Sequence, residues 1–234
     1  QTLSEEVLML KADDPDGEFE VFSPRKANHE YSIDHLGGKF FIRSNEEAEN
    51  FRLFSTSDQN IGRENWEEIV PHRDNVYLSD FDLLDDYLVV SERKDALTQL
   101  RVINNDGSKD EYLPFEESAY VVRSSPTPEA NTDWLRYSYT SLTTPNSVYE
   151  VNLKTGEKKL LKQDEVLGEF DPAQYVTQRL WATARDGTKV SVTVVYHKDT
   201  AIDGTAPCLE YGYGSYGSSM DPRFSSTHLN LLNR

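Results

Sequence analysis

The chain of 234 residues is long enough for one large domain or for about one and a half ordinary ones. Its formal net charge of −17 disfavours a nucleic-acid partner, because phosphate binding requires clustered Lys and Arg. The 13 Tyr, 10 Phe and 3 Trp weight the apolar content toward the large side chains that pleated sheets favour, so the composition indicates a mainly β protein.

The cysteine content and the hydropathy pattern bear on the compartment. Cys208 stands alone, so no internal disulfide can form, and no CxxC or Cys/His spacing of a zinc site occurs. No stretch approaches the roughly 20 apolar residues of a membrane-spanning helix. Gln1 in place of an initiator Met suggests that the native N-terminus is missing. We therefore expect no membrane contact and a reducing, cytoplasmic location, with the periplasm as the alternative because an upstream leader would be hidden.

A similar pattern recurs three times along the first part of the chain. The paired segments are 31–43 with 51–56, 81–92 with 97–104, and 134–140 with 147–153. Each pair reads as a strand, a polar turn and a second strand, without the i, i+3, i+4 apolar spacing of a helix. The period of roughly 45 to 50 residues is typical of propeller blades. We predict part of a β-propeller, with few helices in the first 165 residues.

The pattern changes after Gly156. Residues 165–175 contain Gly and Pro without a clear period, which indicates a connection between domains. We place the boundary after residue 172, so that 1–172 would hold the propeller blades and 173–234 the start of a second domain.

The second domain is predicted to open with strands. Residues 177–184 and 189–197 flank an Arg-Asp-Gly-Thr turn and form a strong hairpin signal. Residues 207–211 predict one further strand. A hairpin, a strand and a glycine-rich turn resemble the opening of an α/β-hydrolase sheet, although periodicity alone would equally fit one more blade.

The glycine-rich segment YGYGSYG (211–217) matches the GxGxxG pattern. A dinucleotide site would also need a helix opening at the last glycine and an acidic residue about 20 positions later. Pro222 follows instead, and no helical pattern begins at the last glycine, so we expect no nucleotide cofactor. The nucleophile elbow GxSxG, centred on Ser215, fails because Tyr213 occupies the place of its first glycine.

A third interpretation of this segment is an oxyanion-stabilising loop. Glycines let the backbone bend sharply, and a tyrosine hydroxyl could then donate a hydrogen bond to the oxygen that becomes negative during acyl transfer. The alternative is an aromatic-rich turn that packs on its own sheet, and the residues alone favour that alternative.

Five short segments together resemble the prolyl oligopeptidase family of serine peptidases, in its oligopeptidase B branch. They are HEYSIDH (29–35), RSN (43–45), LTTP (142–145), TARDG (183–187) and YGYGSYG (211–217). The resemblance covers essentially the whole chain. It implies later blades of a seven-bladed propeller that filters substrates by size, followed by the first strands of an α/β-hydrolase domain. It also implies hydrolysis of short basic peptides after Arg or Lys, without a cofactor or metal.

The resemblance assigns roles to two tyrosines and reverses the preference for a packed turn. Tyr213, the second tyrosine of the YGYG element, would donate to the oxyanion, and Tyr216 would line the substrate pocket. The serine nucleophile, its Asp and His partners and the acidic residues that receive the basic side chain would lie beyond Arg234. We therefore expect this chain to be an internal fragment that is inactive alone.

Two other classes of function stay open. A non-enzymatic propeller module that binds partners on its faces would account for most of the chain, but it has no use for YGYGSYG. A metal-dependent hydrolase would need paired ligands, and the five His show no HExxH spacing. Asp13-Asp14 and Asp85-Asp86 read as solvated turns, because adjacent strand residues point to opposite faces.

Overall fold

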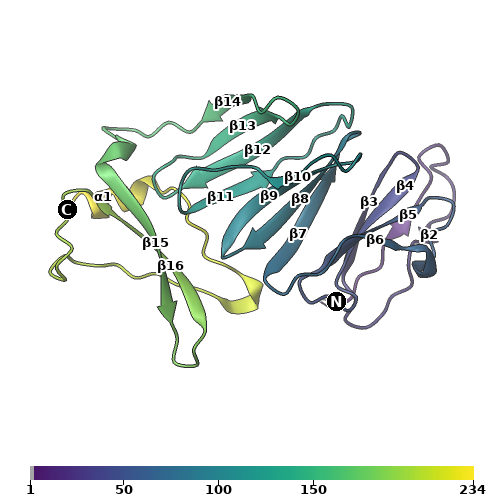
Figure 1. Ribbon diagram of the computed structural model, residues 1–234, viewed down its shortest axis with the longest axis horizontal. Helices are drawn as coiled ribbons and strands as arrows, with labels where there is room; N and C mark the ends of the chain where they lie inside the picture. The colour runs from purple at the N-terminus through teal and green to yellow at the C-terminus, as the bar shows by residue number, and fades with distance from the viewer. Residues whose placement is uncertain (1–2) are drawn as a thin grey trace. The chain divides into compact units, whose positions relative to one another are not determined.

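The computed structural model describes residues 3–234 and consists mainly of antiparallel strands (Figure 1). Three four-stranded sheets follow one another along the chain. They are β3 (Tyr31–Leu36), β4 (Lys39–Ser44), β5 (Arg52–Ser57) and β6 (Glu67–Val70); β7 (Val76–Leu83), β8 (Tyr87–Lys94), β9 (Leu97–Asn104) and β10 (Asp110–Tyr112); β11 (Tyr120–Ser124), β12 (Trp134–Ser141), β13 (Ser147–Asn152) and β14 (Lys158–Gln163). Within each sheet, neighbouring strands are also neighbours in sequence. The mainly β prediction and its repeating unit are thus confirmed.

The remaining elements are short, apart from one long hairpin. They are the pair β1 (Leu8–Met9) and β2 (Glu20–Val21), the hairpin β15 (Tyr175–Thr183) and β16 (Lys189–His197), the 3₁₀ turns η1 (Arg63–Asn65), η2 (Pro172–Gln174) and η3 (Ser215–Gly217), and the helix α1 (Ser226–Leu232). Between residues 3 and 165 the only helical segment is η1, as expected. No helix in the described part of the chain has the length and apolar character needed to cross a membrane.

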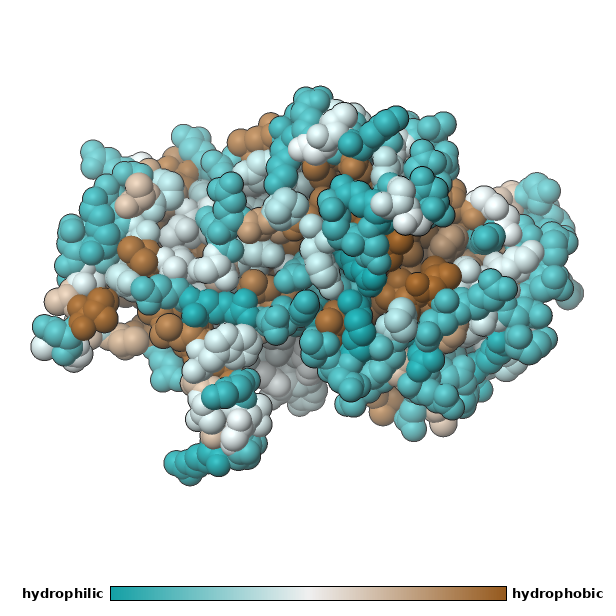
Figure 2. All heavy atoms as spheres, viewed as in Figure 1, coloured by the Kyte–Doolittle hydropathy of each residue, from teal (hydrophilic) through white to brown (hydrophobic). Residues whose placement is uncertain are grey.

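By its internal contacts the chain divides into two compact units, which we describe separately. One holds the residues up to Lys94 together with Arg101–Glu111 and Pro128–Thr132, and the other holds Asp95–Leu100, Tyr112–Thr127 and Asp133–Arg234. On the face drawn in Figure 2, hydrophilic side chains predominate and hydrophobic ones appear in separate groups, in keeping with a chain of which 28% is charged.

Two of the predicted strands are in fact hairpins. Residues 31–43 were expected to form one strand, but Gly37 and Gly38, with φ of 61° and 76°, turn the chain back between β3 and β4. Two successive positive φ values are the geometry of a tight two-residue hairpin turn, which glycine adopts without a steric penalty. Likewise, residues 81–92 are interrupted after Leu83 and contribute to both β7 and β8.

The predicted hairpin at 177–184 and 189–197 is confirmed by β15 and β16, which pair from Tyr175↔His197 to Thr183↔Lys189. The predicted strand at 207–211 is wrong. These five residues are exposed and pair with none of the described strands. An extended segment becomes a strand only when a neighbour satisfies its backbone N–H and C=O groups.

A core between β5–β6 and β7–β8 holds the first compact unit together. Its buried members are Phe51, Leu53, Val70, Leu78, Phe81, Leu88 and Val90, with Phe41, Leu83 and Ile103 packed against them. Four of these side chains, Leu53, Val70, Leu78 and Val90, are at most 1% exposed. Side chains from two consecutive sheets therefore form one core.

His29 lies in a buried polar cluster beside a second core, built around Phe22, Tyr31 and Ile42. Arg63 Nη2 donates to His29 Nδ1 at 3.0 Å, and Ser44 Oγ lies 2.8 Å from His29 Nε2. A guanidinium can only donate, so Nδ1 accepts and the proton sits on Nε2. Burial, with the Arg63 charge second, lowers the pKa of His29.

We expect the free energy of unfolding to fall as the pH falls below about 6.5, the usual pKa of His. In that range the unfolded chain binds a proton that folded His29 resists, so lower pH favours unfolding. Urea denaturation at pH values from about 5.5 to about 7.5 measures the slope. His29→Gln should flatten it, whereas His228→Gln, on the exposed surface of α1, should leave it unchanged. An unaltered slope in His29→Gln would contradict this assignment.

Candidate functional site

The segment YGYGSYG, which we call the tyrosine loop (residues 211–217), lies within a long exposed stretch. Every residue from 201 to 220 is exposed. The stretch begins shortly after β16, whose end is fixed by the hydrogen bond from Lys198 N to Gln174 O at 2.8 Å. The expected alternative, a turn packed on its own sheet, is therefore not what the structure shows.

The backbone of the tyrosine loop turns at η3. Ser218 N donates to Ser215 O at 3.1 Å, and Gly217 has a φ of 69°. Tyr216 has φ 58° and ψ 35°, a left-handed conformation that residues with a Cβ seldom adopt. Such backbone conformations occur preferentially at functional sites. The side chain of Tyr216 is fully exposed.

The structure brings Tyr213 and Tyr216 into the same exposed loop. Tyr213 is 55% exposed and Tyr216 is 100% exposed. In the part of the chain that the structure describes, neither hydroxyl has a hydrogen-bond partner, and neither does Ser215 Oγ. Both phenols are thus free to contact a ligand, while Ser215 has no base beside it. The roles assigned to Tyr213 and Tyr216 stay predictions.

The segment that follows the loop is docked on the sheet β11–β14. Asp221 has a side chain only 6% exposed, and its Oδ2 lies 3.3 Å from Nη2 of Arg123 on β11. Phe224 N donates to Thr140 Oγ1 on β12 at 3.2 Å, and its ring meets Phe170 edge to face at 5.2 Å between centroids. Sequence reasoning missed these anchors, since no local pattern links residues 98 or 84 positions apart.

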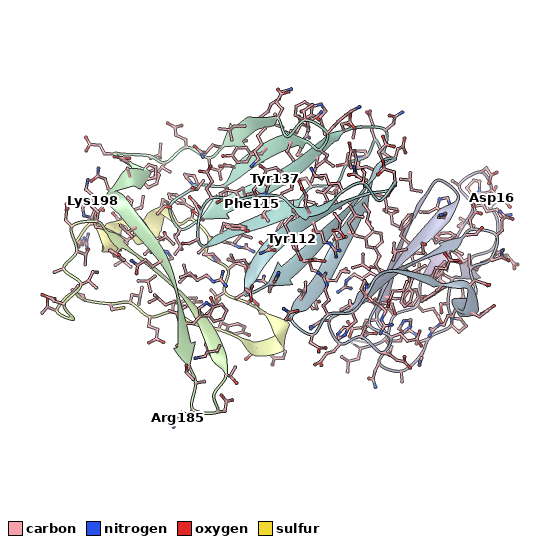
Figure 3. The ribbon with its side chains drawn as sticks, in the orientation of Figure 1. Asp16, Tyr112, Phe115, Tyr137, Arg185 and Lys198 are labelled. Atoms are coloured by element: carbon pink, nitrogen blue, oxygen red, sulfur yellow. The ribbon has the colours of Figure 1, made fainter. Side chains whose placement is uncertain are left out.

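The same unit holds a partly buried aromatic cluster (Figure 3, which labels Phe115 and Tyr137). Its rings are Phe115, Tyr120, Tyr137, Tyr139 and Tyr149, with neighbouring centroids 5.0 to 6.3 Å apart. Rings at these separations gain both burial and favourable edge or offset contacts.

One carboxylate is embedded in this aromatic cluster. Glu117 accepts hydrogen bonds from the Tyr139 hydroxyl at 3.0 Å and from Thr144 Oγ1 at 2.6 Å. Burial, with the Glu117 charge second, raises the pKa of Tyr139, and burial raises the pKa of Tyr137 to about 12. Both phenols therefore stay neutral at physiological pH, and the Tyr139 hydroxyl already donates its proton to Glu117.

The same unit carries a polar hollow of about 410 Å³. It is lined by Thr143, Thr144, Pro145, Gln163, Asp164, Glu165, Val166, Phe170 and Pro172. Asp164 Oδ2 already accepts from Asn146 Nδ2 at 3.2 Å. Among residues 3–234, no group of three or more His, Cys, Asp or Glu side chains is placed to hold a metal ion.

Comparison with known proteins gives a consistent result. Residues 1–164 match the family model described as the prolyl oligopeptidase N-terminal β-propeller domain. Dipeptidyl aminopeptidase BI from Pseudoxanthomonas mexicana is 51% identical over 235 residues, which cover 100% of this chain and 32% of that protein. Protease 2 from Moraxella lacunata is 33% identical over 229 residues, which cover 98% of this chain and 33% of that protein.

Solved structures show the same likeness in three dimensions. Oligopeptidase B from Leishmania major matches 99% of this chain with a TM-score of 0.89 at 31% identity. Oligopeptidase B from Trypanosoma brucei, closed and with covalently bound antipain, matches 100% with a TM-score of 0.89 at 28% identity. The chain spans about a third of the length of these relatives, 34% of each structure. The predicted propeller and family resemblance are confirmed, whereas the opening of an α/β-hydrolase stays a prediction.

We expect chymotrypsin to cut the native 234-residue chain first in the tyrosine loop, after Tyr211, Tyr213 or Tyr216. Exposed backbone without strand pairing fits a protease active site far better than a sheet does. Mass spectrometry of the earliest fragments identifies the site, and the buried Tyr31 and Tyr137 serve as internal controls. First cuts inside the four-stranded sheets would show that the loop is more protected than its exposure indicates.

Proposed function

Because the chain belongs to the prolyl oligopeptidase family, we propose that it is a segment of a serine oligopeptidase that hydrolyses short peptides after Arg or Lys. The observation that carries the proposal is the order of elements along the chain. Three four-stranded sheets are followed by the hairpin β15–β16 and then by the tyrosine loop, in a chain similar over its whole length to oligopeptidase B.

In this proposal residues 1–172 are propeller blades and residues 173–234 begin an α/β-hydrolase domain. The last strand of the third sheet, β14, ends at Gln163, and β15 begins at Tyr175. Between them Asp171 caps the turn η2 by accepting from Ala173 N at 3.0 Å, so the proposed boundary would fall in a short ordered connection. The blades would filter substrates by size.

The proposed chemistry is acyl transfer. A serine hydroxyl gives its proton to a histidine oriented by an aspartate and attacks the scissile carbonyl carbon, and the carbonyl oxygen becomes an oxyanion. These three groups are assigned outside residues 1–234, because the one serine in a comparable turn, Ser215, lacks both the GxSxG pattern and a base. Tyr213 would donate its uncommitted hydroxyl to the oxyanion, and Tyr216 would contact the substrate beside the reacting bond.

The acidic net charge of the chain favours basic peptides as substrates, but charge alone does not establish cleavage after Arg or Lys. The net charge of −17 raises the local concentration of cationic peptides by electrostatic attraction. Arg and Lys side chains would then be received by acidic groups of the parent protein that are assigned beyond Arg234. Hydrolysis needs no cofactor in this scheme, and residues 1–234 alone would be inactive because they lack the nucleophile.

A second candidate is the release of dipeptides from free amino ends. The 51% identity to a protein named dipeptidyl aminopeptidase BI favours it. Both candidates use the same acyl transfer, and they differ in whether the substrate must present a free α-ammonium group two residues before the cut.

Two matched substrates separate these candidates on the full-length protein. An N-acylated peptide ending in an Arg amide should be cleaved as well as its free-amine counterpart if the enzyme is an oligopeptidase. Replacing Arg by the isosteric but neutral citrulline should lower kcat/KM by about tenfold or more, since the charge-assisted contact is lost. Strict dependence on a free amine would favour the dipeptidyl aminopeptidase, and equal rates with citrulline would exclude basic specificity.

Tyr213→Phe in the full-length protein should lower kcat by about 10²- to 10³-fold with little change in KM, because an oxyanion donor acts chiefly in the transition state. Tyr211→Phe is the matched control, since Tyr211 lies in the same loop and is 76% exposed. The isolated 234-residue chain should show no hydrolysis. Equal activity of the two variants would rule out Tyr213 as the donor, and Tyr213-dependent hydrolysis by the isolated chain would rule out a nucleophile beyond Arg234.

A further inference from the structure

The tyrosine loop contributes little to fixing its own position. Every residue from 201 to 220 is exposed, and a Cβ placed on Gly212 or Gly214 would meet no atom within 4 Å. A side chain that stabilises a transition state must nevertheless be held closely in place, because small displacements cost large factors in rate. The geometry of such a loop is therefore set largely where its ends are fixed.

The downstream end is fixed at Asp221, four residues after Gly217. Its carboxylate is almost completely withdrawn from solvent, with 6% of the side chain exposed, and Pro222 beside it is buried. Such a carboxylate needs a cationic partner to offset its lost hydration. Arg123 provides one at 3.3 Å and Arg223 provides another at 3.6 Å.

The two arginines are not equivalent as anchors. Arg223 is two residues from Asp221 in the chain and would move together with the loop. Arg123 belongs to β11, which pairs with β12 at Ser138, so its backbone is held in a four-stranded sheet. Of these two arginines, therefore, Arg123 is the one that ties the loop to a rigid part of the unit.

A second contact lies close to this pair. Phe224 N donates to Thr140 Oγ1 at 3.2 Å, and Thr140 Oγ1 in turn lies 3.0 Å from Thr144 O, which accepts its proton. Thr140 is 7% exposed, so both bonds are largely protected from water. The segment 221–224 is thus attached to β11 and to β12.

We propose that Arg123 is a positioning residue for the tyrosine loop: its ion pair with Asp221 holds the loop so that Tyr213 can reach the oxyanion. This inference rests on the proposed function and deepens it. It implies that a propeller strand, β11, contributes through Arg123 to stabilising the transition state. Arg123 touches no substrate in this scheme and acts only through Tyr213.

The test is a double-mutant cycle on the full-length protein. Arg123→Gln should lower kcat by about tenfold or more while KM changes by less than about twofold, and Arg123→Lys should recover part of the loss. In the Tyr213→Phe background the same Arg123→Gln change should have almost no effect, because the donor that it positions is gone. Arg136→Gln is the matched control, since Arg136 forms the exposed pair with Glu150 in the same sheet, at 2.7 Å.

Hydrogen exchange adds a readout that does not depend on activity. The hydrogen-bonded amides of Ser218 and Phe224 should exchange faster in Arg123→Gln than in the parent protein, and at the parent rate in Arg136→Gln. The inference is overturned if Arg123→Gln leaves kcat and exchange unchanged, or if it lowers kcat by the same factor in both backgrounds. If Tyr213→Phe itself leaves kcat unchanged, the oxyanion assignment fails, and the exchange rates alone then decide whether Arg123 holds the loop.

Discussion

Burial of one sheet face against the next sheet is the constraint on which the first compact unit depends. Side chains from β5 and β6 interlock with side chains from β7 and β8 in a core whose central members are almost inaccessible to water. Fully burying such a side chain contributes about 1.5 to 3 kcal/mol. A four-stranded sheet alone would expose this face, so these two sheets stabilise one another.

Two charged side chains that are largely buried in these sheets, Arg43 and Glu92, have close partners. The guanidinium of Arg43 on β4 lies 3.4 Å from the centre of the Phe51 ring and donates from Nε to Leu78 O at 2.8 Å, which links two consecutive sheets. Glu92 on β8, whose side chain is fully buried, pairs with Arg73 and with Arg101, the latter at 3.5 Å. Removing one partner should lower stability, because the remaining buried charge then loses part of its compensation.

Local chemistry was readable from the sequence and long-range chemistry was not. The strand predicted within 147–153 depends on a pattern of a few residues, and the structure has β13 there. The double glycine at 37–38 is equally local, but the prediction of one strand over 31–43 missed the turn that it forms. The error at 207–211 has another cause, because that segment has the composition of a strand but pairs with no strand among residues 3–234. The contact between Arg123 and Asp221 joins residues 98 positions apart. Helix α1 was not predicted, because its seven residues are too few to establish an amphipathic period.

The tyrosines show how the fold assigns different tasks to one residue type. Tyr139 lies half-buried among aromatic rings and its hydroxyl donates to Glu117, so its single proton is already used inside the protein. Tyr31 is likewise committed, since its hydroxyl donates to Ser23 O at 3.0 Å and accepts from Val7 N at 2.9 Å. A phenol that stabilises a transient negative charge must instead keep its proton available until the charge develops. The tyrosine loop is exposed, so its hydroxyls keep their protons available. The segment 221–224 that follows the loop is attached to the sheet β11–β14 and anchors one end of the loop.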